Sequence, residues 1–445
     1  MNSGEPGCSN HGTRRDEVTD QAMVRLLQIA LPFVVLLIAV ITRAVNPELF
    51  ETLDLKAFDF YQQKSPRIYS EVIPGTDAPM PVKIIDIDDE SLSQFGQWPW
   101  PRSLLSQLIE LLQRSGAAVI AFDVVFAEPD RTSPARVIES WPSSPQLDRI
   151  RPIIAELPDH DLTLAQSMAT ARVVTGFVLT GGANRFVPER KTGFAHIGDD
   201  PRTFAQPVFT AAVTTLPELE AVALGNGSVN AVTDTDQIIR QVPIILRYKD
   251  ELYPGLAAEA LRVGLGAGTI IVKSTDLNAD PSVGQQSGMI NVKIGNFVVP
   301  TDPNGFFWLH HTGPEPRRII PAWKVLTADF DPADVAGKIV FVGASAAALN
   351  DNRASPLNSA TAGVEFHAQV IEQIMSEDFL ERPPLVEDVE IVSPLLIGLV
   401  VIIVVMRLGA AWGGLVAISF IGLGSAYSWT LFVDEGLLTS PLYPA

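Results

Sequence analysis

Three aspartates are the first residues in this sequence that could do chemistry. Asp86 and Asp88 lie at the end of an apolar run at 82–87, and Asp123 lies inside a second apolar run at 117–126. Both runs are typical of strands in a parallel sheet, and open α/β sheets bind ligands at the carboxyl ends of such strands. We therefore expect the three carboxylates at or near the ends of neighbouring strands. Asp88 is equally compatible with capping a turn, whereas a carboxylate inside an apolar strand needs a partner.

The segment between the two runs has the pattern of a helix. Pro101 suits a first turn because its φ is fixed, and leucines between 104 and 112 repeat with helical spacing. Gly116 marks the end of the helix. Strand, helix and strand make a βαβ unit over 82–129, and its crossover makes the two strands parallel.

Two tryptophans and an arginine stand just before and at the start of this helix. Trp98 and Trp100 are compatible with lining a ligand cleft and equally with packing against the sheet or against membrane-proximal helices. We expect Arg102 to pair with Asp88 or Asp123, and such a pair, if buried, would be costly to break from one side.

The sequence around these residues resembles the type-two CHASE domain. The Trp-Pro-Trp-Pro-Arg signature at 98–102 is specific, and the resemblance covers roughly residues 47–384. The matching segments are 85–92, 97–102, 121–130, 338–345 and 363–368. The pattern departs from the family at Asp236-Gln237, where Asp-Gly is expected before the arginine, here Arg240. The resemblance implies an extracytoplasmic sensor joined by membrane helices to cyclases, histidine kinases or other kinases.

Composition narrows the function classes. The 445 residues carry a formal charge of −19, which argues against nucleic acid as a partner. The only cysteine is Cys8, so disulfides cannot support a large domain and the redox compartment stays open. Neighbouring His310 and His311 point to opposite faces of a strand, and no phosphate-binding or nucleophile motif is present. We predict no catalytic residue, no metal and no cofactor within these residues; whether the protein is an enzyme stays open, since cyclase activity would need an output domain after Ala445.

Apolar runs divide the chain into a membrane part and a folded part. A cleaved signal peptide is the rival interpretation of the first run, but the run is longer than usual and no cleavage-site pattern precedes Asn46. Arg407 follows the second run and acids precede it, which favours a cytoplasmic Arg407. The predicted parts are a cytoplasmic tail (1–25), a first membrane helix (26–42), an extracytoplasmic sensor domain (46–384), membrane helices at 391–406 and 408–433, and the start of a further membrane helix (441–445).

The predicted fold class is α/β, with a mostly parallel core sheet, flanking helices, an antiparallel hairpin region and transmembrane α-helices. The hairpin is expected at 229–248. The parallel core strands are expected at 82–87, 117–125, 173–179 and 338–343.

The function predicted from these features is a membrane-anchored sensory input module of a signal-transduction receptor. It passes a stimulus through transmembrane helices to a cytoplasmic output domain absent from this chain, in a layout that resembles class III adenylate cyclases and so cyclic nucleotide biosynthesis. The alternatives are an anchored extracytoplasmic enzyme or solute-binding protein that uses the acidic strand ends, and a structural partner that works through its helices alone. We expect a multi-pass protein of the bacterial inner (plasma) membrane, a periplasmic domain and a homodimer. The candidate ligand-binding or sensing residues are Asp86, Asp88, Ser91, Trp98, Trp100, Arg102, Asp123, Ser345 and Asp351.

Overall fold

The computed structural model describes residues 30–38, 40–41, 47–184, 186–276, 287–349 and 351–441. The chain divides into two compact units. The larger unit is formed by residues 62–381, and the smaller by residues up to 61 together with those from 382 onward. The tail predicted at 1–25 lies outside the described residues, as does all of the segment predicted at 441–445 except residue 441.

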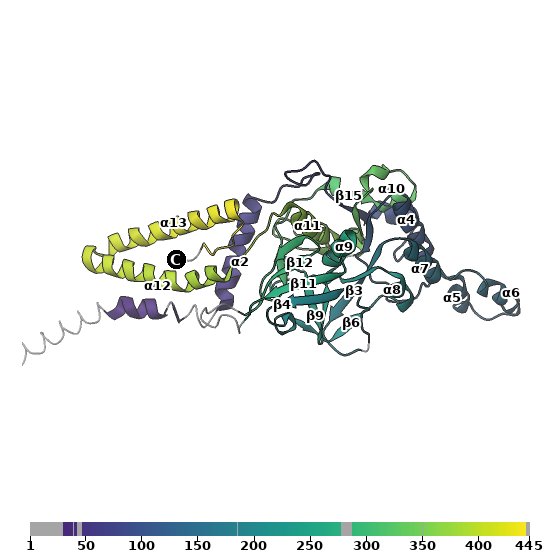
Figure 1. The fold of residues 1–445 in the computed structure, drawn as a ribbon, viewed down its shortest axis with the longest axis horizontal. Helices are drawn as coiled ribbons and strands as arrows, with labels where there is room; N and C mark the ends of the chain where they lie inside the picture. Colours follow the sequence, from purple (N-terminus) through teal and green to yellow (C-terminus); the bar gives the residue numbers. More distant parts are fainter. Residues whose placement is uncertain are drawn as a thin grey trace, which may run out of the picture. The chain divides into compact units, whose positions relative to one another are not determined.

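The larger unit is built on a seven-stranded sheet that is parallel except for one strand, β6. All four predicted core strands are present in it, so the α/β prediction is confirmed for this unit (Figure 1). The sheet order is β15 (Ile319–Pro321), β1 (Val82–Ile87), β16 (Ile339–Ala344), β2 (Val119–Phe122) and β3 (Val173–Thr180), with β6 (Ala211–Val213) antiparallel and β7 (Gly225–Ser228) parallel to β3.

The strands of the predicted βαβ unit are parallel but not adjacent. β16 lies between them, with Phe341 opposite Ile84 on one side and Ala121 on the other. The expectation that Asp86 and Asp123 end neighbouring strands is therefore wrong. The crossover connection fixes the direction of two strands but leaves room for a third, and here a strand from late in the chain fills that room.

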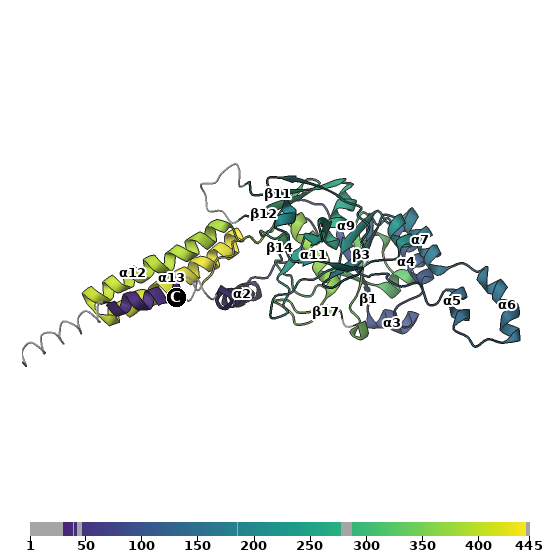
Figure 2. The same cartoon turned by 90° about the horizontal axis from the view of Figure 1, so that it is seen from below.

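Helices cover both faces of this sheet, because alternate strand residues point to opposite faces (Figures 1 and 2). Ile84 and Phe341 belong to the core beneath α9 (Leu256–Leu265) and α11 (Gly363–Ser376). Ile85, Ile120 and Val342 belong to the core on the other face. The helices there are α4 (Arg102–Arg114), α7 (His160–Thr170), α8 (Pro217–Val222) and α10 (Ala322–Leu326). The remaining helices of this unit are α3 (Asp89–Phe95), α5 (Pro134–Glu139) and α6 (Pro145–Ala155), of which α5 and α6 project away from the sheet (Figure 1).

The predicted antiparallel region is present, but its hairpin lies further along the chain than 229–248. Strands β9 (Ile245–Tyr248) and β10 (Glu251–Pro254) pair across Lys249, which has a φ of 54°. The strand near residue 240, β8 (Gln241–Pro243), pairs instead with β14 (Phe306–Trp308). The strands outside the main sheet are β4 (Gly193–Ile197), β5 (Val208–Phe209), β8 (Gln241–Pro243), β9 (Ile245–Tyr248), β10 (Glu251–Pro254), β11 (Thr269–Ser274), β12 (Met289–Ile294), β13 (Phe297–Pro300), β14 (Phe306–Trp308), β17 (Asn352–Arg353) and β18 (Thr361–Ala362).

The smaller unit consists of helices. Residues 30–38 and 40–41 are helical, and α2 (Pro47–Lys64) belongs to this unit as far as Tyr61. Helices α12 (Pro384–Leu408) and α13 (Ala410–Glu435) pack side by side and are separated at Gly409, whose φ is 95° (Figures 1 and 2). Within the described part of the chain, α13 is the one helix long and apolar enough to cross a membrane, and α12 contains a shorter apolar stretch, Val392–Leu408.

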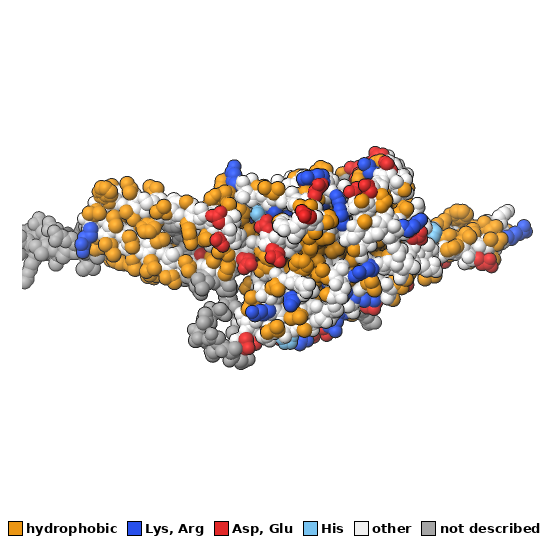
Figure 3. All heavy atoms as spheres, turned by 45° about the horizontal axis from the view of Figure 1, so that its top comes forward, with side chains coloured by type: hydrophobic (Ala, Val, Ile, Leu, Met, Phe, Trp, Pro, Cys, Tyr) orange, Lys and Arg blue, Asp and Glu red, His pale blue; other side chains and the backbone are white. Residues whose placement is uncertain are grey.

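Apolar side chains are exposed along both of these helices (Figure 3). Leu396 in α12 is 57% exposed and Ile418 in α13 is 72% exposed. At one end of the pair, Glu390 accepts hydrogen bonds from Arg382 at 2.7 Å and from the backbone N–H of Ser440 at 2.8 Å. The start of α12 and the segment after α13 therefore lie together, so the two helices are antiparallel.

Candidate functional site

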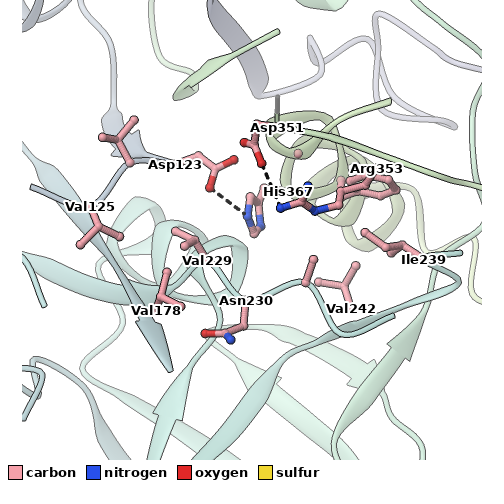
Figure 4. A pocket seen from close by; sticks show the side chains of 14 residues that line it. Asp123, Val125, Val178, Val229, Asn230, Ile239, Val242, Asp351, Arg353 and His367 are labelled. Atoms are coloured by element: carbon pink, nitrogen blue, oxygen red, sulfur yellow. Dashed lines mark ion pairs between the residues drawn. The ribbon is translucent and has the colours of Figure 1, made fainter. Parts of the chain in front are cut away.

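A cavity of about 310 Å³ opens beyond the carboxyl end of β2 in the larger unit (Figure 4). It is formed where the segment after β2 meets the segment after β7, the β17 region and the first turns of α11. Together with Val178 of β3 and the β8 region, these parts of the chain, which are distant in sequence, share one concave surface. The lining residues are Asp123, Val124, Val125, Val178, Val229, Asn230, Ala231, Ile239, Val242, Asp351, Arg353, Gly363, Phe366 and His367.

Asp123 and His367 form the buried polar part of this cavity. The Asp123 Oδ1 and His367 Nε2 atoms are 3.6 Å apart, and each side chain is only 7% exposed. The His367 ring stacks on Phe341 of β16, with 5.9 Å between the ring centroids. Its Nδ1 atom is buried and has no hydrogen-bond partner among the described residues. The imidazole is therefore held in place by packing, while part of its hydrogen-bonding capacity stays unused.

Asp351 brings a second carboxylate to the same cavity. Burial, and then the charge of Asp123, raise the pKa of Asp351 to about 6. Arg353 lies close by, with 3.4 Å between its Nη2 and the Asp351 Oδ1, but its side chain is 44% exposed. A Cβ atom at Gly363 would lie 2.9 Å from the Asp351 carboxylate, so a larger residue there would displace this carboxylate. The first turn of α11 and this carboxylate are thus fitted to each other.

The opposite wall of the cavity is apolar. Figure 4 shows Val178 and Val229 on the other side of the His367 ring from Asp351. Asn230 is polar but already occupied, since its side chain exchanges two 2.7 Å hydrogen bonds with the backbone of Leu179. The cavity therefore has one charged end and one aliphatic side.

Asp86 and Ser345 form a separate pair at the ends of β1 and β16. The Asp86 carboxylate accepts hydrogen bonds from the backbone N–H of Ser345 at 2.9 Å and from its hydroxyl at 2.5 Å. Burial raises the pKa of Asp86 to about 6. Asp88 caps α3 by accepting a 2.8 Å hydrogen bond from the N–H of Ser91. The Ser91 hydroxyl accepts one from the N–H of Trp323. These hydrogen bonds connect the ends of β1 and β16 and the starts of α3 and α10, and none of these residues lines the cavity.

The aromatic residues before α4 belong to the core. Trp100 is 1% exposed, packs edge-on against Trp98, and donates a 2.8 Å hydrogen bond to the carbonyl of Gly96. Of the two roles left open for the tryptophans, Trp100 takes the packing role. Arg102 does not pair with Asp88 or Asp123 as expected. Its Nε lies 3.5 Å from Asp161 Oδ1, because α7 packs directly against α4.

The structure therefore separates the predicted candidates into groups. Asp123 and Asp351 line one cavity, and Asp86 bonds to Ser345 elsewhere. Asp88 caps α3 through Ser91, Trp98 and Trp100 pack in the core, and Arg102 lies beside Asp161. Sequence reasoning missed His367 and Arg353. His367 lies within the segment 363–368 that resembles the family, and that was the signal that could have found it.

A buried ionic network on α11 was also missed. Glu372 accepts hydrogen bonds from Arg67 Nη2 at 2.8 Å, from Arg318 Nε at 2.6 Å and from Arg318 Nη2 at 3.0 Å. The Glu372 and Arg318 side chains are 0% exposed and Arg67 is 4% exposed. Arg67 also donates from its Nε to the carbonyl of His310 at 3.0 Å. Residues so far apart in the chain give no local signal of this arrangement.

The described residues contain no group of three or more histidine, cysteine, aspartate or glutamate side chains placed to hold a metal ion.

A comparison with protein families gives one match. The CHASE2 domain family matches residues 33–408. No match was found among curated proteins or among solved structures. CHASE2 is an extracytoplasmic sensory domain family, and the predicted resemblance is confirmed at that level. Because the match covers most of the sequence, this protein belongs to the CHASE2 domain family.

Proposed function

We propose that this protein is the sensory input module of a membrane receptor, in which the cavity beside His367 receives the stimulus and α11 transmits it. The observation that carries the proposal is that one helix bears both parts. Gly363, Phe366 and His367 in the first turns of α11 line the cavity. Glu372, further along the same helix, is the centre of the buried ionic network. A displacement of α11 by a ligand would therefore strain that network.

The network stands close to both ends of the larger unit along the chain. Arg67 follows α2, which ends at Lys64, and α11 ends at Ser376, shortly before the unit ends at Glu381. A ligand changes the position of α11 only if its affinity differs between two arrangements of this helix. A cavity formed at the N-terminal end of this helix meets that condition, because movement of α11 changes the cavity wall.

The remaining parts of the proposal concern the membrane. Helices α12 and α13 would span it as an antiparallel pair, with the helical residues 30–38 and 40–41 as part of a further pass, in the bacterial inner membrane. The exposed apolar side chains of α12 and α13 support this role. The output would be a cytoplasmic enzyme, an adenylate or guanylate cyclase, fed by a homodimer of this module.

A cyclase fusion tests the function. A cyclase catalytic domain is joined after Ala445, and cyclic AMP is measured in bacteria that lack their own cyclase. We expect Asp123→Ala to change the output several-fold at equal protein level in the membrane, because it removes a carboxylate from the cavity. The matched control is Glu251→Gln, which affects only an exposed ion pair with Arg190. A stable Asp123→Ala variant with normal output, or the same output after deletion of residues 62–381, would contradict the proposal.

The cavity also supports a second candidate, an anchored solute-binding protein or enzyme. The observation in its favour is a carboxyl group with a pKa of about 6, Asp351, in the same cavity as a histidine. This candidate predicts ligand binding or turnover by the purified chain with no change in the output of the fusion. The sensory role predicts that both change together.

A further inference from the structure

We propose that the cavity binds a small molecule that presents an ammonium group to Asp123 and Asp351 and an aliphatic body to the valine-rich wall. The inference rests on the proposed function, since it names the chemical class of the stimulus received at the same site. Two features carry it, the balance of charge in the cavity and the unused hydrogen-bonding capacity of His367.

The charge balance favours a cation. Two carboxylates line the cavity, and Arg353 is its only guanidinium among the described residues. Arg353 contacts Asp351 but not Asp123, and its side chain is 44% exposed, so solvent weakens its effect. Asp123 is 7% exposed, and its 3.6 Å separation from His367 is too long for a hydrogen bond. A buried carboxylate in this state gains from a donor that carries positive charge.

His367 supplies the second, independent observation. Its side chain is 7% exposed and faces the cavity, and its Nδ1 has no hydrogen-bond partner among the described residues (Figure 4). An unpaired buried polar atom costs free energy, of the order of 1–3 kcal/mol. When the proton is on Nε2, towards Asp123, the Nδ1 atom is an acceptor. An ammonium group has three donors, and two of them can bond to the carboxylates of Asp123 and Asp351.

The rest of the cavity selects a compact aliphatic body. A volume of about 310 Å³ is at the lower end for small-molecule sites. Its wall is formed by Val125, Val178, Val229, Ile239 and Val242. These side chains offer dispersion contacts and no hydrogen bonds, so an aliphatic chain fits and a sugar does not. A carboxylate alone would meet Asp123 and Asp351 and be repelled.

Two sources share this chemistry, a simple amine and an amino acid. Arg353 distinguishes them, because only an amino acid would bring a carboxylate for the guanidinium to bind. The probes are therefore 3-methylbutylamine, leucine and 3-methylbutanoate, which have the same branched chain and differ in their charged groups. Binding is measured by calorimetry on the purified full chain in lipid nanodiscs.

We expect binding of 3-methylbutylamine, leucine or both, and none of 3-methylbutanoate. Asp351→Asn should weaken that binding at least tenfold, while Glu251→Gln, at an exposed ion pair, should leave it unchanged. If the amino acid is the ligand, Arg353→Gln should weaken the binding of leucine at least tenfold. The same change should leave the binding of 3-methylbutylamine unchanged or make it tighter. Asp123→Asn provides a second, isosteric variant in case Asp351→Asn does not fold.

Three results would overturn the inference. They are binding of 3-methylbutanoate as tight as that of the amine, no binding of either amino compound, and amine binding that is unchanged in both aspartate variants. Failure here is distinguishable from failure of the sensory role. If amines do not bind but Asp123→Ala still alters the cyclase fusion, only the ligand class is wrong. If amines bind and the fusion does not respond, the site stands and the sensory role is wrong.

Discussion

Replacing Glu372 with glutamine should strongly destabilise the larger unit, because the change leaves two buried guanidinium groups without their carboxylate. Glu372 accepts three hydrogen bonds from Arg67 and Arg318, at 2.6 to 3.0 Å. Burial lowers the pKa of Arg67, because it disfavours the charged form of the guanidinium. Glutamine keeps the shape but removes the negative charge, and its amide group would face the cations.

The size of the effect follows from the burial of all three side chains. Removing one partner of a buried ion pair costs about 3–5 kcal/mol. The remaining carboxylate near Arg318, Glu365, lies 3.3 Å from its Nη1 and offsets only part of this loss. With a urea dependence of about 3 kcal/mol per molar, the unfolding midpoint should fall by about 1–1.7 M.

The assay is pulse proteolysis of the full chain in detergent across a urea series, which follows loss of the intact larger unit. Glu251→Gln is the control, because Glu251 is 53% exposed and Arg190 is 46% exposed. Exposed pairs contribute about 0–1 kcal/mol, so the control midpoint should hardly move. Equal midpoints for Glu372→Gln and Glu251→Gln would refute the view that this network fixes α11.

Three more predictions concern single positions. Burial raises the pKa of Asp351 to about 6 in the folded state. The pKa of an aspartate in the unfolded chain is about 3.9. The protonated carboxyl therefore stabilises the fold fully below about pH 3.9, and this contribution is lost as the pH rises through 6. The melting temperature of Asp351→Asn, compared with the unchanged protein, should therefore rise between pH 4 and pH 7; a constant difference would contradict this. Gln237 has a φ of 64°, so Gln237→Gly should stabilise the larger unit by about 0.5–1 kcal/mol in urea unfolding and Gln237→Ala should not. A Cβ at Gly343 would lie 2.5 Å from that of Val364. Gly343→Ala should therefore lower the free energy of unfolding, measured in urea, by about 1–3 kcal/mol. A Cβ at Gly313 would meet no atom within 4 Å, so Gly313→Ala should leave the free energy of unfolding unchanged in the same measurement.

Much of the main sheet was readable from the sequence, because its strands are continuous apolar runs. The runs at 82–87 and 338–343 match β1 and β16 within one residue at each end. The helix predicted between Pro101 and Gly116 is α4, Arg102–Arg114. The order of the strands was not readable. Periodicity reports whether a segment is buried, and it carries no information on which distant segment lies beside it.

The candidate site was only half predictable for the same reason. Asp123 stood out as a carboxylate in an apolar run, and Asp351 was named among the candidate sensing residues. Their shared cavity depends on α11 reaching the end of β2, where Gly343 lets Val364 approach. At Gln237 the sequence alone showed the departure from the family, which has glycine at this position, and the structure gives its physical meaning. The backbone there needs a positive φ that glycine adopts without strain.

The position of β16 has a consequence for how this chain reaches its folded state. β1 and β2 have their long parallel partner only when residues 339–344 are available, and β15 also comes late. A chain that crosses a membrane from its N-terminus therefore presents two apolar strands with open edges until most of the domain has been exported. Such long-range pairing makes folding slow. Biogenesis would then depend on a chaperone that shields β1 and β2, and premature termination before Ile339 would leave these strands exposed to aggregation or proteolysis.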